Sequence, residues 1–346
     1  MKRWVVLVGT LYLLLSMGAL GVAAEEGDTG SITGRVVSRT GEGSPIADQE
    51  VVLQGVRHGS EATILPVRVA RTDSEGAFRF DGLPVSEDTS FLVLVTYSSV
   101  EYESRDVTLT EEAPSVELEM EVFEPTTSDQ ALRVTLDHMV LQADAQRQVV
   151  SVLEVFQVLN EGDQVYVNDG QEPGSPATFR LSFPEGATQV TAISGVAPQG
   201  LVSTAAGFAD TSPLVPGERE IALGYEVPYA ESDLLLQKTL LYATDRLAVL
   251  VKDDGFTVHS STLSDAQETE TGEERYLMLT GDSLPDGADI DLSLSGLPTA
   301  SAGGGGPAGL SPWLAVGLAA TTVGVAVLYP RLRRRGQRAP AADKAD

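Results

Sequence analysis

The sequence contains no cysteine among its 346 residues. This absence excludes disulfide bonds, iron–sulfur clusters, thiolate zinc sites, cysteine nucleophiles and a lipid anchor attached to cysteine. A domain built from this chain therefore has to be held together by burial of its core.

Positive charge is also scarce, with only four lysines: Lys2, Lys238, Lys252 and Lys344. Residues 25–330 carry 15 Lys+Arg against 48 Asp+Glu, a net charge of −33. Such a surface repels phosphate backbones, so we expect no nucleic-acid partner. The acidity suits bound cations, basic partners or a salty medium, although keeping the domain soluble explains it more simply.

Residues typical of catalytic and metal sites are few. The three histidines, His58, His138 and His259, lie far apart in the sequence. His58-Gly-Ser-Glu61 matches a His-x-x-Glu pair, but two ligands alone do not make a zinc site. No phosphate loop, Gly-x-Ser-x-Gly turn, Ser-x-x-Lys pair or His-Glu-x-x-His helix is present. We therefore expect no cofactor and no enzymatic activity; a hydrolase whose site is assembled only in space is the remaining alternative.

The N-terminus has the pattern of a secretory signal. Lys2 and Arg3 precede an apolar run from Trp4 to Val22, which ends in small residues before Glu25. We predict a signal peptide over residues 1–24 and a short linker over 25–29. The run is long enough for an uncleaved N-terminal anchor, which is the alternative. Export without disulfides is more typical of a bacterial or archaeal protein than of a eukaryotic one.

A second apolar run begins near the C-terminus and continues for 20 residues without a charge, the length that spans a bilayer. We predict one transmembrane helix over residues 310–330 and a basic cytoplasmic tail over 331–346, because arginines favour the cytoplasmic side. The anchor comprises boundary and interfacial residues, small residues for helix packing, and the arginines that follow: Leu310, Trp313, Gly317, Gly324, Tyr329, Arg331, Arg333, Arg334 and Arg335.

A glycine-rich stretch precedes this run, and we interpret residues 299–309 as a tether. The glycines, the apolar run and the arginine cluster together resemble bacterial sorting tails of the GlyGly C-terminal type, which are cut by rhomboid-type proteases. The 17 residues after Tyr329 depart from that pattern. A permanent single-pass anchor is therefore favoured, and a processed tail is the alternative. Both place residues 25 to about 300 outside the cytoplasm.

Residues 30–123 alternate between apolar and polar side chains in short segments separated by turn residues. Phe78 and Phe80 share one face of their predicted strand. The run 91–97 is almost continuously apolar, as in a central strand, while 116–122 alternates apolar residues with Glu. About seven such strands predict an antiparallel β-sandwich.

Several motifs in this unit resemble a known family. Gly34-x-Val36, Val51-x-Leu53 and, above all, Thr72-Asp-Ser-Glu-Gly76-x-Phe78-x-Phe80-x-Gly82-Leu-Pro84 look like the carboxypeptidase regulatory-like domain, a transthyretin-like β-sandwich. The resemblance covers residues 30–122. It implies a fold and a module that is usually non-catalytic, and it implies no reaction.

After a predicted hinge at residues 124–128, residues 129–298 show β-patterning again, with strands expected near 132–136, 149–159, 177–183, 219–225, 247–251, 256–259, 275–279 and 290–294. No segment has a 3.6-residue period. The fold class is therefore mainly β: two antiparallel β-sandwich domains in tandem, plus one C-terminal transmembrane helix. The second domain resembles no family that we can name.

Two weak ligand signals complete the prediction. Acidic turns at Asp73, Glu75, Asp253 and Asp254 could bind Ca²⁺, although Asp is simply frequent in turns. Tyr225, Tyr229 and Tyr242 could form a glycan platform, although such tyrosines more often pack. We expect a membrane-anchored extracytoplasmic protein that binds another envelope component or has a structural role. A glycan-binding module and an accessory protein of a membrane enzyme or transport complex are the alternatives.

Overall fold

The computed structural model describes residues 29–167, 177–197, 199–204, 207–271 and 274–299. These residues form 25 β-strands and no helix, which confirms the all-β prediction. No helix within these ranges is long and apolar enough to cross a membrane. The predicted signal peptide, the tether, the transmembrane helix and the basic tail lie outside the described residues.

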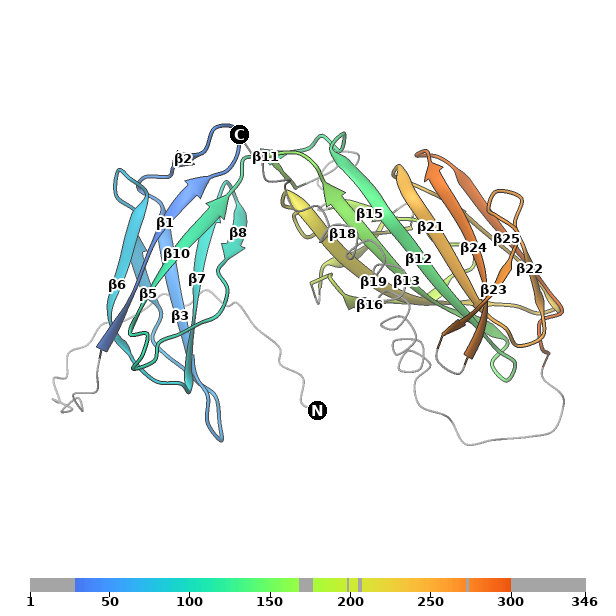
Figure 1. Cartoon of the computed structure of the whole chain (residues 1–346), viewed down its shortest axis with the longest axis horizontal. Helices are drawn as coiled ribbons and strands as arrows, with labels where there is room; N and C mark the ends of the chain where they lie inside the picture. The colour runs from blue at the N-terminus through green and yellow to red at the C-terminus, as the bar shows by residue number, and fades with distance from the viewer. Residues whose placement is uncertain (1–28, 168–176, 198, 205–206, 272–273, 300–346) are drawn as a thin grey trace, which may run out of the picture.

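The first domain is a sandwich of two sheets (Figure 1, blue to cyan). One sheet contains β10 (Ser115–Val122), β1 (Thr29–Ser38), β2 (Ser44–Pro45) and β6 (Ala77–Pro84). The other contains β3 (Glu50–Arg57), β4 (Thr63–Ile64), β5 (Arg68–Arg71), β7 (Thr89–Tyr97), β8 (Val100–Glu103) and β9 (Val107–Thr108).

The predicted core of this domain is confirmed. Phe78 and Phe80 are both buried, and their rings meet edge to face with centroids 6.0 Å apart. β7 is a central strand that pairs with β3, β8 and β9. Along β10 the glutamates point outward, whereas Leu118, Met120 and Val122 are buried.

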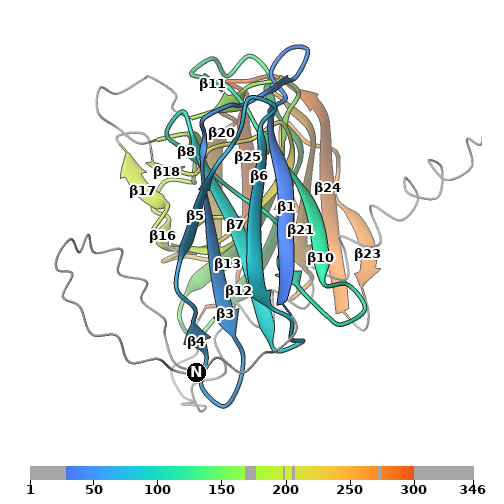
Figure 2. The same ribbon diagram turned by 90° about the vertical axis from the view of Figure 1, so that its left-hand side faces the viewer.

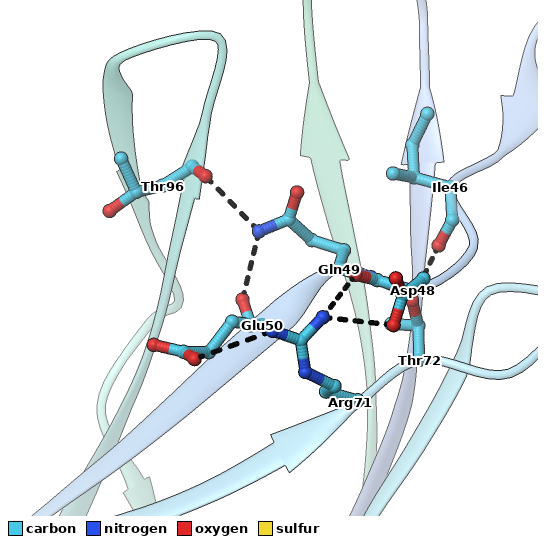
Figure 3. Close-up of polar contacts among 7 residues, drawn as sticks. All are labelled: Ile46, Asp48, Gln49, Glu50, Arg71, Thr72 and Thr96. Atoms are coloured by element: carbon cyan, nitrogen blue, oxygen red, sulfur yellow. Dashed lines mark hydrogen bonds and ion pairs between the residues drawn. The ribbon is translucent and has the colours of Figure 1, made fainter.

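A polar network around Thr72 holds the turn between β2 and β3 (Figure 3). The buried Thr72 hydroxyl donates to the Ile46 carbonyl at 2.7 Å and accepts from the Gln49 amide at 2.8 Å. Asp48, in this turn, has a positive φ of 55° and accepts from Arg71 at 2.8 Å. The first residue of the Thr72–Pro84 motif therefore has a structural role.

The second domain is larger and contains three sheets (Figure 1, green to orange). The main sheet has the order β16 (Thr188–Ser194), β19 (Gly217–Pro228), β13 (Val149–Asn160), β12 (Leu132–Asp144), β21 (Thr244–Lys252), β24 (Glu274–Leu284) and β23 (Gln267–Thr271). The two smaller sheets are β15 (Phe179–Leu181), β18 (Gly207–Asp210), β17 (Leu201–Thr204), and β20 (Asp233–Thr239), β25 (Asp289–Ser295), β22 (Thr257–His259).

The largest core cluster lies between the main sheet and the β20–β25–β22 sheet. It contains Val152 and Tyr225 from the main sheet and Leu236 and Leu292 from the smaller one. Residues that alternate along β13 point into this layer because successive side chains of a strand face opposite sides.

The prediction of purely antiparallel sheets is wrong at three places. β1 pairs with β10 in parallel, β12 pairs with β21 in parallel, and β11 (Pro125–Thr126) pairs with β14 (Val165–Tyr166) in parallel. In each case the two strands are far apart in sequence, and the chain passes through other strands before returning in the same direction. The alternation within a segment predicts a strand, but it does not specify whether a distant partner strand runs parallel or antiparallel to it.

The two domains meet at an ordered joint (Figures 1 and 2). The predicted hinge contains β11 (Pro125–Thr126), which pairs in parallel with β14 (Val165–Tyr166) of the second domain. Val165 is fully buried and belongs to the core cluster of the first domain. Gly41 N also donates to Asp163 Oδ2 at 2.9 Å. Hydrogen bonds and apolar packing therefore both cross the joint.

Candidate functional site

A charged cluster lies inside the second domain, where charges are rarely found. Lys238 comes from β20 of the smaller sheet, while Asp137 on β12 and Glu154 on β13 come from the main sheet. The exposed fractions are 6% for Lys238, 1% for Asp137 and 0% for Glu154. Burying three ionisable groups costs several kcal/mol per ion unless they compensate one another, so this arrangement requires a specific reason.

The strand pattern explains why these side chains point inward. Along β20, Leu236 and Lys238 are buried while Gln237 and Thr239 are exposed. Asp137 is paired directly with Phe156 across β12 and β13, and Glu154 is paired with Met139. Asp137 and Glu154 are therefore diagonal neighbours on one face of adjacent strands, and Lys238 reaches them from the opposite sheet.

The contacts within the cluster are direct. Lys238 Nζ donates to Asp137 Oδ2 at 3.2 Å and also to Glu154 Oε1. The Tyr225 hydroxyl donates to Glu154 Oε2 at 3.0 Å. Lys238 Nζ lies 5.1 Å from the centroid of the Phe156 ring, a cation–π distance. Asp137 Oδ1 is buried without a hydrogen-bond partner among the described residues.

Burial changes the protonation of this cluster. It raises the pKa of Glu154 to about 8, and the nearby Asp137 carboxylate acts in the same direction, whereas Lys238 opposes it. Burial by itself lowers the pKa of Lys238, but the charges of Asp137 and Glu154 outweigh it and raise that pKa. At neutral pH Glu154 is therefore mostly protonated, whereas Lys238 keeps its positive charge.

A small cavity adjoins the cluster. Its volume is about 20 Å³, and its lining includes Asp137, Lys238, Phe156 and Leu240. This is room for about one water molecule and for no larger ligand. The cavity beside the cluster is therefore too small to hold an external substrate.

The calcium candidates are placed as turn residues. Asp73 Oδ1 accepts from the amides of Glu75 and Ala77, both at 2.9 Å, and so caps its own turn. Asp253 forms an ion pair with Arg275 at 3.5 Å. Burial raises the pKa of Asp254. Within the described ranges, no group of three or more His, Asp or Glu side chains could hold a metal ion.

The other candidates also have local roles. His58 Nε2 forms a hydrogen bond with Ser90 Oγ at 2.8 Å. His138 is buried on the opposite face of β12 from Asp137, and burial lowers its pKa. Tyr225 and Tyr229 are 0% and 5% exposed, so these two tyrosines are packed rather than displayed as a glycan platform. The anchor residues from Leu310 to Arg335 lie outside the described residues.

Sequence reasoning missed the strand that carries Lys238 and gave no role to Asp137 or Glu154. A signal was present, because Lys238 is one of two lysines between residues 25 and 330. Glu154 stands between Leu153 and Val155 in a mostly apolar strand, whereas Asp137 lies in a strand that contains several other polar residues. A charge at an inward position of a strand requires a partner, and these three are mutual partners.

No protein-family model and no curated protein matches this chain. Three solved structures resemble it over β-rich regions. They are a candidate carbohydrate-binding protein from Pseudomonas aeruginosa (15% identity, TM-score 0.20, covering 29% of this chain and 92% of that one), a DUF3823 family protein from Parabacteroides merdae (13%, 0.22, 62% and 91%) and the major pilin SpaD from Corynebacterium diphtheriae (12%, 0.22, 79% and 84%).

Because all three TM-scores are low, these similarities support no conclusion about function. The β-rich fold implied by the resemblance of residues 30–122 to the carboxypeptidase regulatory-like domain is present. Membership of that family is not shown by any of the comparisons.

Proposed function

We propose that the chain is a membrane-anchored extracytoplasmic protein in which two joined β-sandwiches have a binding or structural role without catalysing a reaction. The observation that carries this proposal is the joint between the domains. Val165 of the second domain is buried in the core cluster of the first, and β11 pairs with β14. A pair of sandwiches fixed in this way acts as a rigid spacer, which would hold the first domain at a set distance from the predicted anchor.

The small size of the cavity beside the buried cluster also favours a non-enzymatic role. The cavity beside the buried cluster has room for about one water molecule. Glycan binding through Tyr225 and Tyr229 has less support because both side chains are buried. An accessory role in a membrane complex is compatible with the same spacer. The capture experiment distinguishes the two roles because it identifies the component that the chain binds.

The first experiment tests topology. Intact cells that express the full chain with a C-terminal tag are treated with protease. We expect loss of the ectodomain while the tag stays protected and in the membrane fraction. A tag that appears in the medium, or is digested, would contradict the anchored topology.

The second experiment tests the role. The full chain is captured from detergent-solubilised membranes beside the Val165→Asp variant, which disrupts the joint. We expect an envelope component that the intact chain enriches, that captures the chain in the reciprocal experiment, and that the variant retains less well. Binding on a glycan array without such a component, or turnover of peptide or glycan substrates, would replace this proposal.

A further inference from the structure

The buried cluster places an amine against a carboxyl group with a third acid beside both. Lys238 Nζ lies 3.2 Å from Asp137 Oδ2 and also contacts Glu154. We propose that Lys238 and Asp137 become joined by an isopeptide bond within the folded second domain, and that Glu154 carries the proton in this reaction. This inference is independent of the proposed function, since it concerns chemistry between residues of the chain itself.

Proximity lowers the barrier to such a reaction. Groups held about 3–3.5 Å apart in a fixed orientation react with effective molarities of roughly 10⁵–10⁸ M. The two sheets set this orientation, because Lys238 is anchored on β20 and Asp137 on β12. Condensation also replaces a buried ion pair by a neutral amide, which removes the desolvation cost of two charges.

The assignment of the acceptor follows from the contacts of the two acids. Glu154 has both oxygens engaged, one with Lys238 and the other with the Tyr225 hydroxyl. Asp137 has one oxygen on Lys238, while its Oδ1 has no hydrogen-bond partner among the described residues. Asp137 therefore has an oxygen that can accept a proton and leave, and Glu154, whose side chain also interacts with Asp137, is placed to supply that proton.

The protons that these three side chains already carry are sufficient for the reaction. Transfer of one proton from the Lys238 ammonium to the Asp137 carboxylate produces a neutral amine beside a carboxylic acid, without any change in the net charge of the cluster. Glu154 is itself neutral because burial raises its pKa. It can hydrogen-bond to the Asp137 carboxyl group and polarise it.

The step balances as a condensation. The lone pair of Nζ attacks Cγ of Asp137, and a C–N bond forms. Glu154 donates its proton to the departing oxygen, the C–O bond breaks, and one water leaves. The nitrogen returns a proton to Glu154, so the acid is regenerated and no oxidant, reductant or co-reactant is needed.

The surroundings favour the amide after it has formed. The cavity of about 20 Å³ beside Asp137 and Lys238 can receive the water that leaves. Apolar side chains such as Phe156 and Leu240 line it, and exclusion of bulk water slows hydrolysis. The bond would connect residues 101 positions apart and link the two sheets, so it would constrain the unfolded chain as a disulfide does.

Peptide mass spectrometry of the purified full chain tests the proposal. Trypsin cuts after arginine and lysine, so the unlinked chain yields residues 134–147 with Asp137, 148–180 with Glu154 and 220–238 with Lys238. An acylated Lys238 is not cut. We expect residues 134–147 joined to residues 220–246, lighter than the sum of the two by one water.

Substitutions distinguish the roles of the three side chains in the cluster. Lys238→Arg should abolish the linked species, whereas Lys252→Arg, which changes the other ectodomain lysine, should leave it intact. Glu154→Gln should slow bond formation by about 10²–10⁴-fold in newly made chains, the usual loss when a general acid–base group is removed. Asp137→Asn should still react with loss of ammonia, and its product should have the same mass as the wild-type product.

Two results would overturn the proposal. One is recovery of residues 134–147 and 220–238 as separate peptides from the folded wild-type chain. The other is a linked species in which residues 148–180 replace 134–147, because this would make Glu154 the acceptor. Hydrogen exchange shows whether the Lys238→Arg and Asp137→Asn chains are folded. If Lys238→Arg does not fold, bond formation in Asp137→Asn still tests the proposal.

Discussion

The hydroxyl of Thr40 in the first domain donates a hydrogen bond to the carbonyl oxygen of Asp163 in the second domain at 2.7 Å. The same hydroxyl accepts from the amide of Glu124 at 2.9 Å, at the point where the chain leaves the first domain. One side chain therefore connects the first domain, the connecting segment and the second domain. Specific hydrogen bonds therefore form the joint, so substitutions there can test whether it holds the two sandwiches together.

The joint should open when Val165 becomes charged. Val165→Asp places a carboxylate in the core cluster of the first domain, where it has no partner among the core residues. We expect protease cleavage within residues 124–128 to accelerate by at least about tenfold, which corresponds to about 1.4 kcal/mol. Val67→Asp is the control, because Val67 is 57% exposed. Equal cleavage of the two variants would show that Val165 does not hold the joint.

The turn before β3 should depend on Thr72. Thr72→Val removes the hydrogen bonds to Ile46 and Gln49 while keeping the shape of the side chain. We expect the first domain to lose about 2 kcal/mol, since each buried hydrogen bond contributes about 1 kcal/mol. Hydrogen exchange of peptides that cover β3 measures the loss. Arg71→Ala in the same network should cost less than about 1 kcal/mol because its ion pair is exposed.

Arg147 should stabilise the second domain through Glu226. Its guanidinium donates two hydrogen bonds to the buried Glu226 carboxylate, at 2.6 and 2.5 Å. Arg147→Ala leaves that carboxylate with Gln189 as its remaining side-chain donor among the described residues. Since Arg147 is 40% exposed and water screens the pair, we expect a loss of about 2 kcal/mol.

Urea unfolding, followed by hydrogen exchange of peptides from β13 and β19, measures the effect of Arg147→Ala. Arg79→Ala removes an exposed pair with Asp81, and its unfolding should not differ from that of the wild type. A loss of similar size in both variants would mean that burial of Glu226 is not the cause.

Stability should fall as the pH rises through the pKa of Glu154. That pKa is raised from its ordinary value of 4.5 to about 8 in the folded chain. The folded state therefore binds the proton more tightly. The associated stability is fully present below pH 4.5 and is lost as the pH rises through about 8.

The free energy of unfolding, measured from pH 4.5 to 9, tests this dependence. Because other groups titrate as well, and because Glu154→Gln would also slow the proposed bond, the informative quantity is the difference between Lys238→Arg and the double variant Lys238→Arg, Glu154→Gln. We expect this difference to change by on the order of 2–4 kcal/mol across the window. A constant difference would contradict the raised pKa.

Much of the fold could be predicted from local pattern. The alternation in β10 and the apolar run in β7 predict strands that the structure contains, because burial of one or both faces of a strand is recorded in consecutive residues. Several strands were not predicted, among them β8, β16, β17, β18, β20 and β23. β20 reads Asp-Leu-Leu-Leu-Gln-Lys-Thr, and its three consecutive leucines hide the alternation that its burial follows.

The candidate site was the least predictable part. Asp137, Glu154 and Lys238 are separated by up to 101 positions, and no motif spacing connects them. Each residue alone looks like an ordinary polar residue of a strand. Only the face to which each one points makes them partners, and that face depends on register and on sheet packing.

The sequence by itself determined the all-β class, the division into two β-patterned units and the strong acidity, since strand alternation, turn residues and charge are local or additive properties. It also predicts the anchor and the topology, which remain predictions. Only the tertiary structure decided the parallel pairings, the ordered joint and the meeting of Lys238 with Asp137 and Glu154. These depend on which strands become neighbours, and that choice is made by packing between distant segments rather than by any segment alone.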